Sequence, residues 1–218
     1  MSSIISLTTD FGLSDPYVAA VKGSILAINP DATIVDISHS IPPQDIERGA
    51  FVLACAFPYF PAGSIHVAVV DPGVGSERRA LAVSSPAGVF IGPDDGILSA
   101  ALPDTARDAV EGHGAVSVSL PADIRAFALS DSRFHRAPVS PTFHARDIFA
   151  PVAARISLGV LPSEFGPEVK EVTALAPFRA EVGGDGMVVG EAAAPERHGW
   201  RSECVGNAIA KRSHLSTL

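Results

Sequence analysis

The stretch VVDPGVGSERRALAV, Val69–Val83, sets a carboxylate and two guanidinium groups on either side of one tight turn. Asp71 follows an apolar run typical of a strand, the chain turns through a proline and two glycines, and Arg78 and Arg79 precede the next apolar run. A carboxylate can take a proton from an attacking water, and a guanidinium can hold that carboxylate ionised and donate to developing negative charge. Asp and Arg are also ordinary residues of strand ends and loops, so the pattern alone leaves both interpretations open.

Two further carboxylate and glycine pairs follow apolar runs elsewhere in the chain. Asp10 comes after IISLTT and is followed by Gly12, and Asp94 and Asp95 come after GVFIGP and are followed by Gly96. In open α/β sheets the ligand crevice lies outside the carboxyl ends of the strands. We therefore expect these turns to converge with the Asp71 turn on one site.

The residues of these turns do not favour the binding of a phosphate group. Neither G-x-x-x-x-G-K-[ST] nor G-x-G-x-x-G is present, and carboxylates repel phosphate. Carboxylates suit ribose hydroxyls, an ammonium group or a metal ion. A metal-dependent hydrolase built on Asp10, Asp71, Asp94 and His144 is therefore one alternative, although the chain lacks a compact ligand motif such as H-E-x-x-H.

The elements that must position these residues alternate between strand-like and helix-like segments. The residue patterns predict strands at 4–9, 32–38, 63–71, 79–85 and 87–95, and helices at 15–30 and 43–60. A further amphipathic helix is predicted after His144, with Arg146 and Asp147 as structural residues at its start. This order predicts an α/β fold with a mostly parallel sheet flanked by helices.

Composition limits the function classes. The 218 residues are 47% hydrophobic and 18% charged, which suits one large globular domain, and the net charge of −8 argues against a nucleic-acid partner and fits a small cationic ligand. Cys55 and Cys204 are far apart and have no metal-ligand spacing. No signal peptide or membrane span is recognisable, so we expect a cytoplasmic protein with no membrane partner.

Four stretches, found between about residues 3 and 190, together resemble one known family. They are LTTDFGLSDPYVAAVKGSILAINPDATIVDISHSIPPQDIERGA, VVDPGVGSERR, FIGPDDGIL and VSPTFHARDIFAP. They are similar to the S-adenosylmethionine (SAM) hydroxide adenosyltransferases, which are relatives of the fluorinase and chlorinase enzymes. The resemblance implies attack of water-derived hydroxide on C5′ of the ribose of SAM, which yields adenosine and L-methionine. SAM is then the substrate, and no cofactor is expected.

The resemblance places the residues around the attacking water at Asp71, Arg78 and His144, with Arg79 as the alternative if the loop register differs by one. In fluorinase-like members the aspartate position is a tyrosine and the arginine position is a small residue. A carboxylate repels a halide in a dry site. Hydroxide transfer is therefore favoured over a SAM-dependent halogenase of the chlorinase type.

The resemblance also implies substrate-binding residues. Asp10 corresponds to the acceptor of the ribose 2′- and 3′-hydroxyls, Asp15 to a carboxylate near the methionine amino group, and Phe143 to a wall of the ribose and adenine. Asp15 has a second interpretation as the N-cap of the helix that begins near Pro16. Asp95 stands where the family usually has asparagine, which adds a charge near the site, and Ala145 replaces a usual glycine.

The end of the chain departs from the family pattern. Residues 1–175 are predicted to form the α/β N-terminal catalytic domain, and residues 176–218 are predicted to be a remnant of, or a replacement for, the family's β-rich C-terminal domain. Asn207, in VGNAI, is the candidate for an adenine-contacting asparagine. In the family the pocket forms between subunits of a homotrimer, so a trimer is expected here. A trimeric protein that binds SAM or adenosine without turnover is the main alternative.

Overall fold

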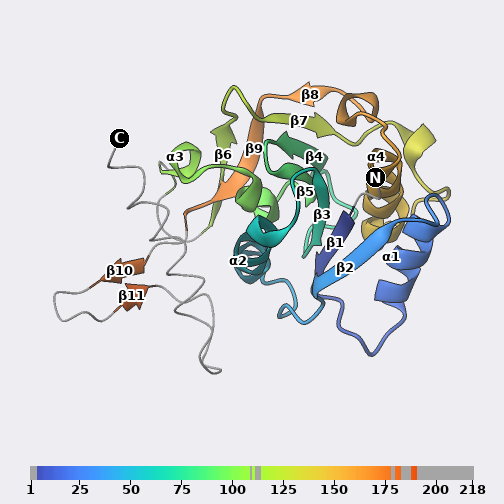
Figure 1. Ribbon diagram of the computed structural model, residues 1–218, viewed down its shortest axis with the longest axis horizontal. Coiled ribbons are helices and arrows are strands. Elements are labelled where there is room, and N and C mark those ends of the chain that lie inside the picture. The colour runs from blue at the N-terminus through green and yellow to red at the C-terminus, as the bar shows by residue number, and fades with distance from the viewer. Residues whose placement is uncertain (1–3, 109, 111–113, 178–179, 183–187, 191–218) are drawn as a thin grey trace. The chain divides into compact units, whose positions relative to one another are not determined.

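The computed structural model describes residues 4–108, 110, 114–177, 180–182 and 188–190 (Figure 1). The chain divides into two compact units, 1–176 and 177–218. In the second unit, strands β10 (Ala180–Val182) and β11 (Val188–Gly190) pair antiparallel. Asn207 and the rest of the predicted C-terminal remnant beyond residue 190 lie outside the described residues.

A seven-stranded mixed sheet forms the centre of the first unit, in the order β2-β1-β3-β5-β4-β7-β8. Its strands are β1 Ile4–Thr9, β2 Thr33–Ser38, β3 Ser64–Val69, β4 Ala80–Ser85, β5 Gly88–Pro93, β7 Arg125–Ala128 and β8 Glu168–Val169. β2, β1, β3 and β5 are parallel, whereas β4, β7 and β8 join antiparallel. The α/β class is confirmed, but the prediction of a mostly parallel sheet is wrong for the part formed by β4, β7 and β8.

The reason for the reversal lies in one short connection. Ser85 pairs with Gly88, so only Pro86 and Ala87 join β4 to β5. A two-residue link permits only an antiparallel pair, because a parallel pair needs a crossover of a dozen or more residues. The reversal carries the start of β4 to the edge at which β5 ends, and Ala80 pairs with Pro93.

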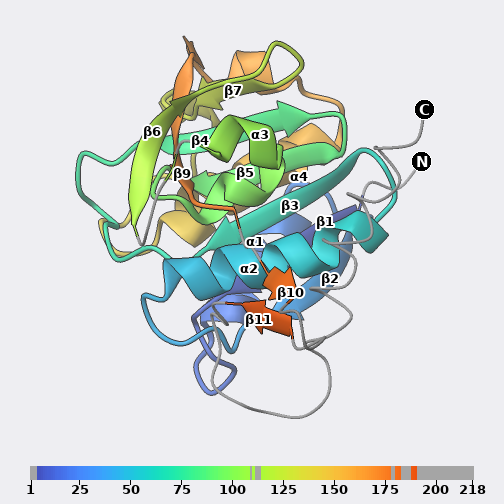
Figure 2. The ribbon, with the colours of Figure 1, turned by 90° about the vertical axis from the view of Figure 1, so that its left-hand side faces the viewer.

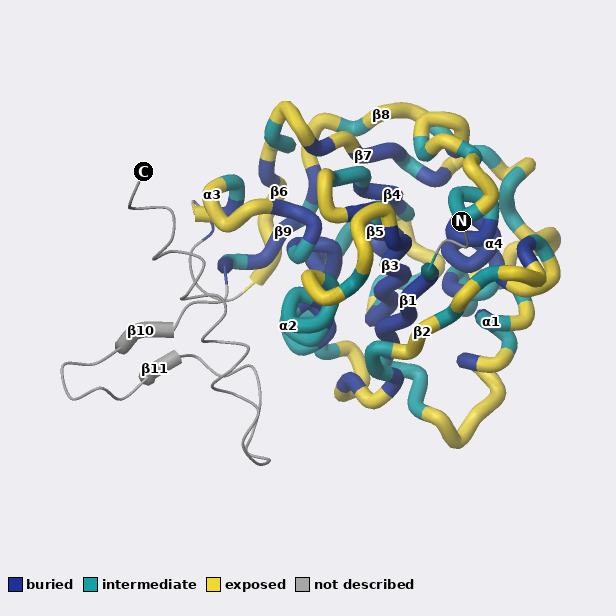
Figure 3. The backbone as a smooth tube through the Cα atoms, viewed as in Figure 1, coloured by how far each residue is buried: buried dark blue, intermediate teal, exposed yellow. Residues whose placement is uncertain are grey.

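Helices cover both faces of the sheet (Figures 1 and 2). One face packs against α1 (Tyr17–Leu26), the π-helical turn η4 (Ala145–Phe149) and α4 (Ala150–Ser157), and the other packs against α2 (Ile46–Ala56) and the short 3₁₀ helix η2 (Ile97–Ala101). In β3, Val67 and Val69 belong to the first cluster and Ala68 to the second. This alternation is the period-two pattern of a strand buried on both faces, which Figure 3 shows as buried central strands.

The remaining elements lie around this core. They are η1 (Phe57–Tyr59), α3 (Asp104–Arg107), β6 (Ala115–Ser119), η3 (Ser132–Phe134), η5 (Pro162–Glu164) and β9 (Glu171–Leu175). β6 and β9 form a separate antiparallel pair. Across the part of the chain that the structure describes, no helix has the length and apolar character needed to cross a membrane.

Candidate functional site

The predicted strand-end carboxylates lie along one edge of the sheet. In the parallel set, Thr9 of β1 pairs with Val69 of β3, and Val67 of β3 pairs with Ile91 of β5. The three strands therefore end side by side. Asp10 directly follows β1, Asp71 follows β3 after one residue, and Asp94 and Asp95 directly follow β5.

Asp71, Arg78 and His144 are in direct contact at this edge. Nε of Arg78 donates to Oδ1 of Asp71 at 2.8 Å, and its NH2 group pairs with the second carboxylate oxygen, so the ion pair is bidentate. The same NH2 lies 2.9 Å from Nδ1 of His144, 66 residues further along the chain. The Asp71 and Arg78 side chains are only 5% and 10% exposed. The structure thus brings together the three residues that the sequence singled out.

The Arg78 contact fixes the proton on His144. A guanidinium only donates hydrogen bonds, so Nδ1 of His144 must accept, and the neutral ring carries its proton on Nε2. Burial lowers the pKa of His144 below its usual range, and the positive charge of Arg78 lowers it further. His144 is therefore a neutral ring with an Nε2–H donor at neutral pH.

Arg79 makes different contacts. Its Nε donates to Oδ2 of Asp94 at 2.8 Å, and its NH2 donates to the carbonyl of Glu171 at 3.0 Å. Asp94 also accepts the backbone N–H of Thr173 at 2.7 Å. Arg78, not Arg79, is therefore the arginine that contacts Asp71. Asp94 instead holds β9 in place through its hydrogen bond with Thr173.

The carboxylates do not assemble into a metal site. Among the residues that the structure describes, no group of three or more His, Cys, Asp or Glu side chains is placed to hold a metal ion. Asp94 pairs with Arg79, and Asp10 accepts the backbone N–H of Gln44 at 2.9 Å. The arrangement of Asp10, Asp71, Asp94 and His144 thus does not support a metal-dependent hydrolase.

A small hollow of about 50 Å³ lies beside Asp71, Arg78 and His144, which we call the triad. Its lining residues are Phe11, Val69, Asp71, Val74, Thr142, Phe143, His144 and Ala145. The ring of Phe143 packs edge-on against Tyr17 at 5.2 Å and against Phe11 at 6.0 Å. Neither Phe11 nor Tyr17 was predicted as a site residue, although Phe11 directly follows Asp10 in TTDFG. A hollow of this size holds a water molecule but not a nucleoside, since one water occupies roughly 30 Å³.

Asp15 does not cap the first helix. α1 begins at Tyr17 with Pro16 at the N-cap position, and no side chain makes a capping hydrogen bond there. The capping interpretation of Asp15 is therefore wrong. Its carboxylate is exposed, in the turn between Asp10 and α1.

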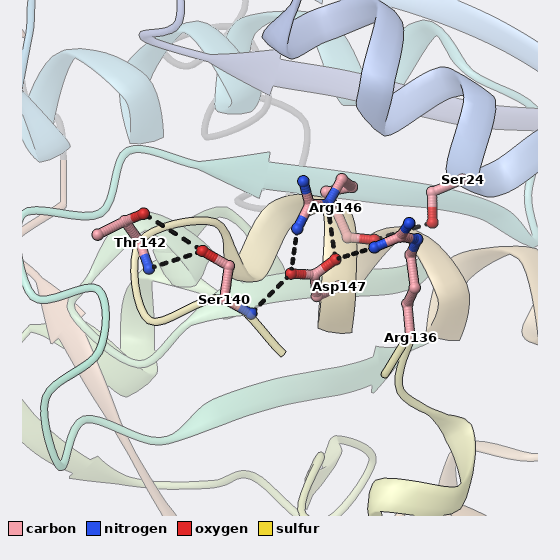
Figure 4. Close-up of polar contacts among 6 residues, drawn as sticks. All are labelled: Ser24, Arg136, Ser140, Thr142, Arg146 and Asp147. Carbon is pink, nitrogen blue, oxygen red and sulfur yellow. Dashed lines mark hydrogen bonds and ion pairs between the residues drawn. The ribbon is translucent and has the colours of Figure 1, made fainter. Parts of the chain in front are cut away.

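The segment that carries Phe143 and His144 is anchored by Asp147 (Figure 4). Asp147 is fully buried and accepts hydrogen bonds from Nε and NH2 of Arg146, at 2.6 and 2.7 Å, and from the backbone N–H of Ser140 at 2.9 Å. Ser24 of α1 donates to the carbonyl of Arg146 at 2.8 Å. These contacts confirm the structural interpretation of Arg146 and Asp147.

Asp95 is a half-buried residue next to Asp71, Arg78 and His144. Its Oδ1 accepts the backbone N–H of Ile97 at 3.0 Å, while Oδ2 is buried with no partner among the described residues. Burial raises the pKa of Asp95 to about 7, and the negative charge of Asp71 adds to this effect. Asp95 is therefore close to half-protonated at neutral pH.

We expect Asp95→Asn to stabilise the protein at pH 8 and to change little at pH 4. The unfolded carboxyl titrates near 3.8 and the folded one near 7, so the folded state holds the extra proton between these values. Wild-type stability therefore falls as the pH rises from about 4 to about 7. Asparagine removes this loss, which is on the order of a few kcal/mol. Urea unfolding of both proteins at pH 4, 6 and 8 measures it, and a difference that does not change with pH would contradict the raised pKa.

Gly75 allows the Asp71 turn to approach the segment that carries His144. Its φ is +79°, and a Cβ atom at this position would overlap the carbonyl oxygen of Pro141. We expect Gly75→Ala to lower the free energy of unfolding by about 1 to 3 kcal/mol, since it adds both backbone strain and this overlap. Gly73→Ala is the matched control, because its Cβ would meet neighbours no closer than 3.4 Å. Equal losses in the two variants, measured by urea unfolding, would show that the close approach is unimportant.

The family model and the most similar relatives agree on one protein family. A family model described as the SAM hydroxide adenosyltransferase N-terminal domain matches residues 5–166. A protein from Salinispora tropica named (R)-S-adenosyl-L-methionine hydrolase is 45% identical over 169 residues, which are 78% of this chain and 59% of that protein. A protein of the same name from Thermus thermophilus is 40% identical over 190 residues, which are 83% of this chain and 68% of that protein.

More distant relatives and a solved structure extend the comparison. A fluorinase from an Actinoplanes species is 28% identical over 186 residues, 75% of this chain and 57% of that protein. The crystal structure of an uncharacterized conserved protein from Thermotoga maritima superposes with a TM-score of 0.68 at 31% identity, and it covers 81% of this chain and 62% of that one. The chain spans less than two thirds of the length of the Salinispora protein.

Proposed function

The chain belongs to the SAM hydroxide adenosyltransferase family, and on that premise we propose that it hydrolyses S-adenosyl-L-methionine to adenosine and L-methionine. The observation that carries the proposal is the partly buried contact of Asp71 with Arg78 and of Arg78 with His144, beside a hollow of about 50 Å³. The names of the Salinispora and Thermus relatives support the same reaction.

In the proposed mechanism, Asp71 accepts the proton and His144 orients the water. Arg78 occupies Nδ1 of His144 and leaves Nε2 protonated, so the ring donates to the water oxygen. A carboxylate has about four lone-pair positions, and the bidentate pair uses two of them, so Asp71 can still accept from water. As the water oxygen bonds to C5′, the C5′–S bond breaks, its electron pair goes to sulfur, and a water proton passes to Asp71.

Arg78 holds the Asp71 carboxylate in place through the bidentate pair and stabilises charge on the attacking oxygen. The sulfonium makes methionine a good leaving group, so alignment and proton removal are the remaining tasks. The same carboxylate disfavours a halide nucleophile, because two anions in a dry site repel each other. We therefore propose hydroxide transfer rather than halogenation.

We propose that the substrate lies along the strand edge, with Asp10 at the ribose hydroxyls, Asp15 near the methionine amino group, Phe143 against the ribose and adenine, and Asp95 beside the triad. The hollow of about 50 Å³ is too small for an adenosyl group, so other walls must complete the pocket. We propose that a homotrimer supplies them from a neighbouring subunit. The role of Asn207 at adenine stays a prediction.

A second candidate function is a protein that binds SAM or adenosine without turnover. One experiment separates the two. The purified protein is incubated with SAM in ¹⁸O-labelled water, with and without chloride, and adenosine, 5′-chloroadenosine and methionine are separated by chromatography.

We expect ¹⁸O-labelled adenosine and methionine in equal amounts in both buffers. Intact SAM together with co-purified adenosine would instead support the binding protein, and 5′-chloroadenosine in the chloride buffer would support the halogenase. No product and no bound nucleoside, from folded protein, would contradict both the hydrolase and the binding protein.

A further inference from the structure

A second and larger cavity, of about 580 Å³, lies between α1 and the segment that runs from His135 through α4. Its lining residues are Ala20, Gly23, Ser24, Ala27, Ile28, His135, Arg136, Arg146, Pro151 and Arg155. None of these residues lines the hollow beside Asp71. Figure 4 shows Arg136, Arg146 and Ser24 from this group around Asp147.

The charge of this cavity is opposite to that of the whole chain. Three guanidinium groups line it and no carboxylate does, whereas the chain carries a net charge of −8. The nearest carboxylate in contact with these groups is Asp147, which is fully buried and is held by Arg146 through two hydrogen bonds. One carboxylate against three guanidinium groups leaves an excess of about two positive charges.

Two of the arginines keep donor capacity for a ligand. The closest Asp147 contact of Arg136 is long, at 3.5 Å, and its side chain is 53% exposed. The NH1 group of Arg155 donates to the neutral carbonyls of Phe134 and Pro151, at 3.0 and 3.1 Å, and no carboxylate in the described part of the chain forms an ion pair with it. A guanidinium has five N–H donors in a fork that matches phosphate and carboxylate oxygens.

The opposite wall of the cavity is apolar or small. Ala20 and Gly23 come from α1, Ala27 and Ile28 directly follow it, and a Cβ atom built on Gly23 meets nothing within 4 Å. The volume lies within the range of about 300 to 1,000 Å³ that is usual for small-molecule sites. The cavity therefore offers an apolar surface beside a doubly positive one.

We propose that this cavity binds a phosphate monoester with an apolar body, at a site separate from the SAM site. A monoester carries about −1.5 to −2 charges at neutral pH, which matches the excess of positive charge. Its three terminal oxygens suit Arg136 and Arg155, and its apolar body suits the α1 wall. This inference is independent of the proposed SAM chemistry.

Phenyl phosphate is the probe, because it has no adenine that would enter the SAM site. Titration calorimetry and ³¹P line broadening compare phenyl phosphate with inorganic phosphate and benzoate on the full chain. We expect phenyl phosphate to bind best, since inorganic phosphate lacks the apolar body and benzoate lacks the second charge.

Two variants and one control locate the site. Arg136→Gln is expected to weaken phenyl phosphate binding by about tenfold or more, as for a lost charge-assisted hydrogen bond. Gly23→Leu is expected to abolish binding by filling the cavity while every arginine stays. Arg133→Gln removes the same charge from a side chain that is 81% exposed, pairs with Asp131 and does not line the cavity, so it is expected to bind as the wild type does.

Three outcomes would overturn the proposal. They are the absence of binding to folded wild-type protein at millimolar phenyl phosphate, equal weakening in Arg133→Gln and Arg136→Gln, and unchanged binding in Gly23→Leu. Equal affinity for inorganic phosphate would overturn the part assigned to the apolar wall. Circular dichroism of each variant confirms that a loss of binding is not a loss of folding.

Discussion

Asp71→Asn is expected to lower the turnover of SAM by about 10² to 10⁴-fold, the range usual for loss of a general base. The amide has nearly the same shape as the carboxylate but cannot take the proton of the attacking water. Its NH₂ group also opposes the guanidinium of Arg78, which donates to both carboxylate oxygens in the wild type. Adenosine release at saturating SAM, followed over the pH range 5 to 9, measures the loss.

Asp94→Asn is the matched control for this variant. Asp94 follows a neighbouring strand at the same edge and is also paired with an arginine, but that arginine is Arg79 and Asp94 does not contact the triad. We expect turnover to stay within about tenfold of the wild type in Asp94→Asn, since no reacting group is removed. If Asp71→Asn, once shown to be folded and to bind adenosine, keeps more than about a tenth of wild-type turnover, Asp71 is not the proton acceptor.

Arg78→Gln is expected to have the second largest effect, and on two quantities at once. Turnover should fall by about 10² to 10³-fold, because a donor to developing negative charge is lost. The free energy of unfolding should fall by about 3 to 5 kcal/mol, because the Asp71 carboxylate, whose side chain is only 5% exposed, loses its partner. Adenosine release and urea unfolding measure the two losses.

Arg79→Gln tests whether the loss in Arg78→Gln comes from the position of Arg78 or only from the loss of one positive charge. It removes the same charge one residue along. Asp94, whose side chain is also only 5% exposed, then loses its arginine but keeps the backbone N–H of Thr173, so we expect a smaller loss of stability than in Arg78→Gln, about 1 to 3 kcal/mol. Arg78→Lys should recover part of the activity lost in Arg78→Gln, because it restores the charge without the bidentate fork. A larger loss of turnover in Arg79→Gln than in Arg78→Gln would reverse the assignment.

Much of the fold followed from local patterns in the sequence. The apolar run Ile4–Thr9 is β1 with the predicted bounds, and the segment 15–30, with a proline near each end, contains α1 at Tyr17–Leu26. Apolar periodicity reports which residues are buried and where elements begin and end. It carries no information on strand direction, and so the antiparallel half of the sheet was missed. Only the two-residue link through Pro86 and Ala87 indicated that reversal.

The sequence by itself determined which residue types stand at the strand ends, because Asp10, Asp71 and Asp94 each follow an apolar run within the chain. It left open whether Arg78 or Arg79 meets Asp71. Successive residues of an extended chain point to opposite faces, so at most one of the two can do so. The side-chain contacts decide which one, because Arg78 pairs with Asp71 and Arg79 pairs with Asp94.

The proton position on His144 was decided in the same way. It depends on a hydrogen bond from Arg78, which lies 66 residues earlier, and on the partial burial of His144. The raised pKa of Asp95 and the anchoring of the His144 segment by Asp147 also arise from burial by distant residues. Residue identity is local, whereas desolvation and hydrogen-bond geometry are set by neighbours in space, and only the tertiary structure brings those neighbours together.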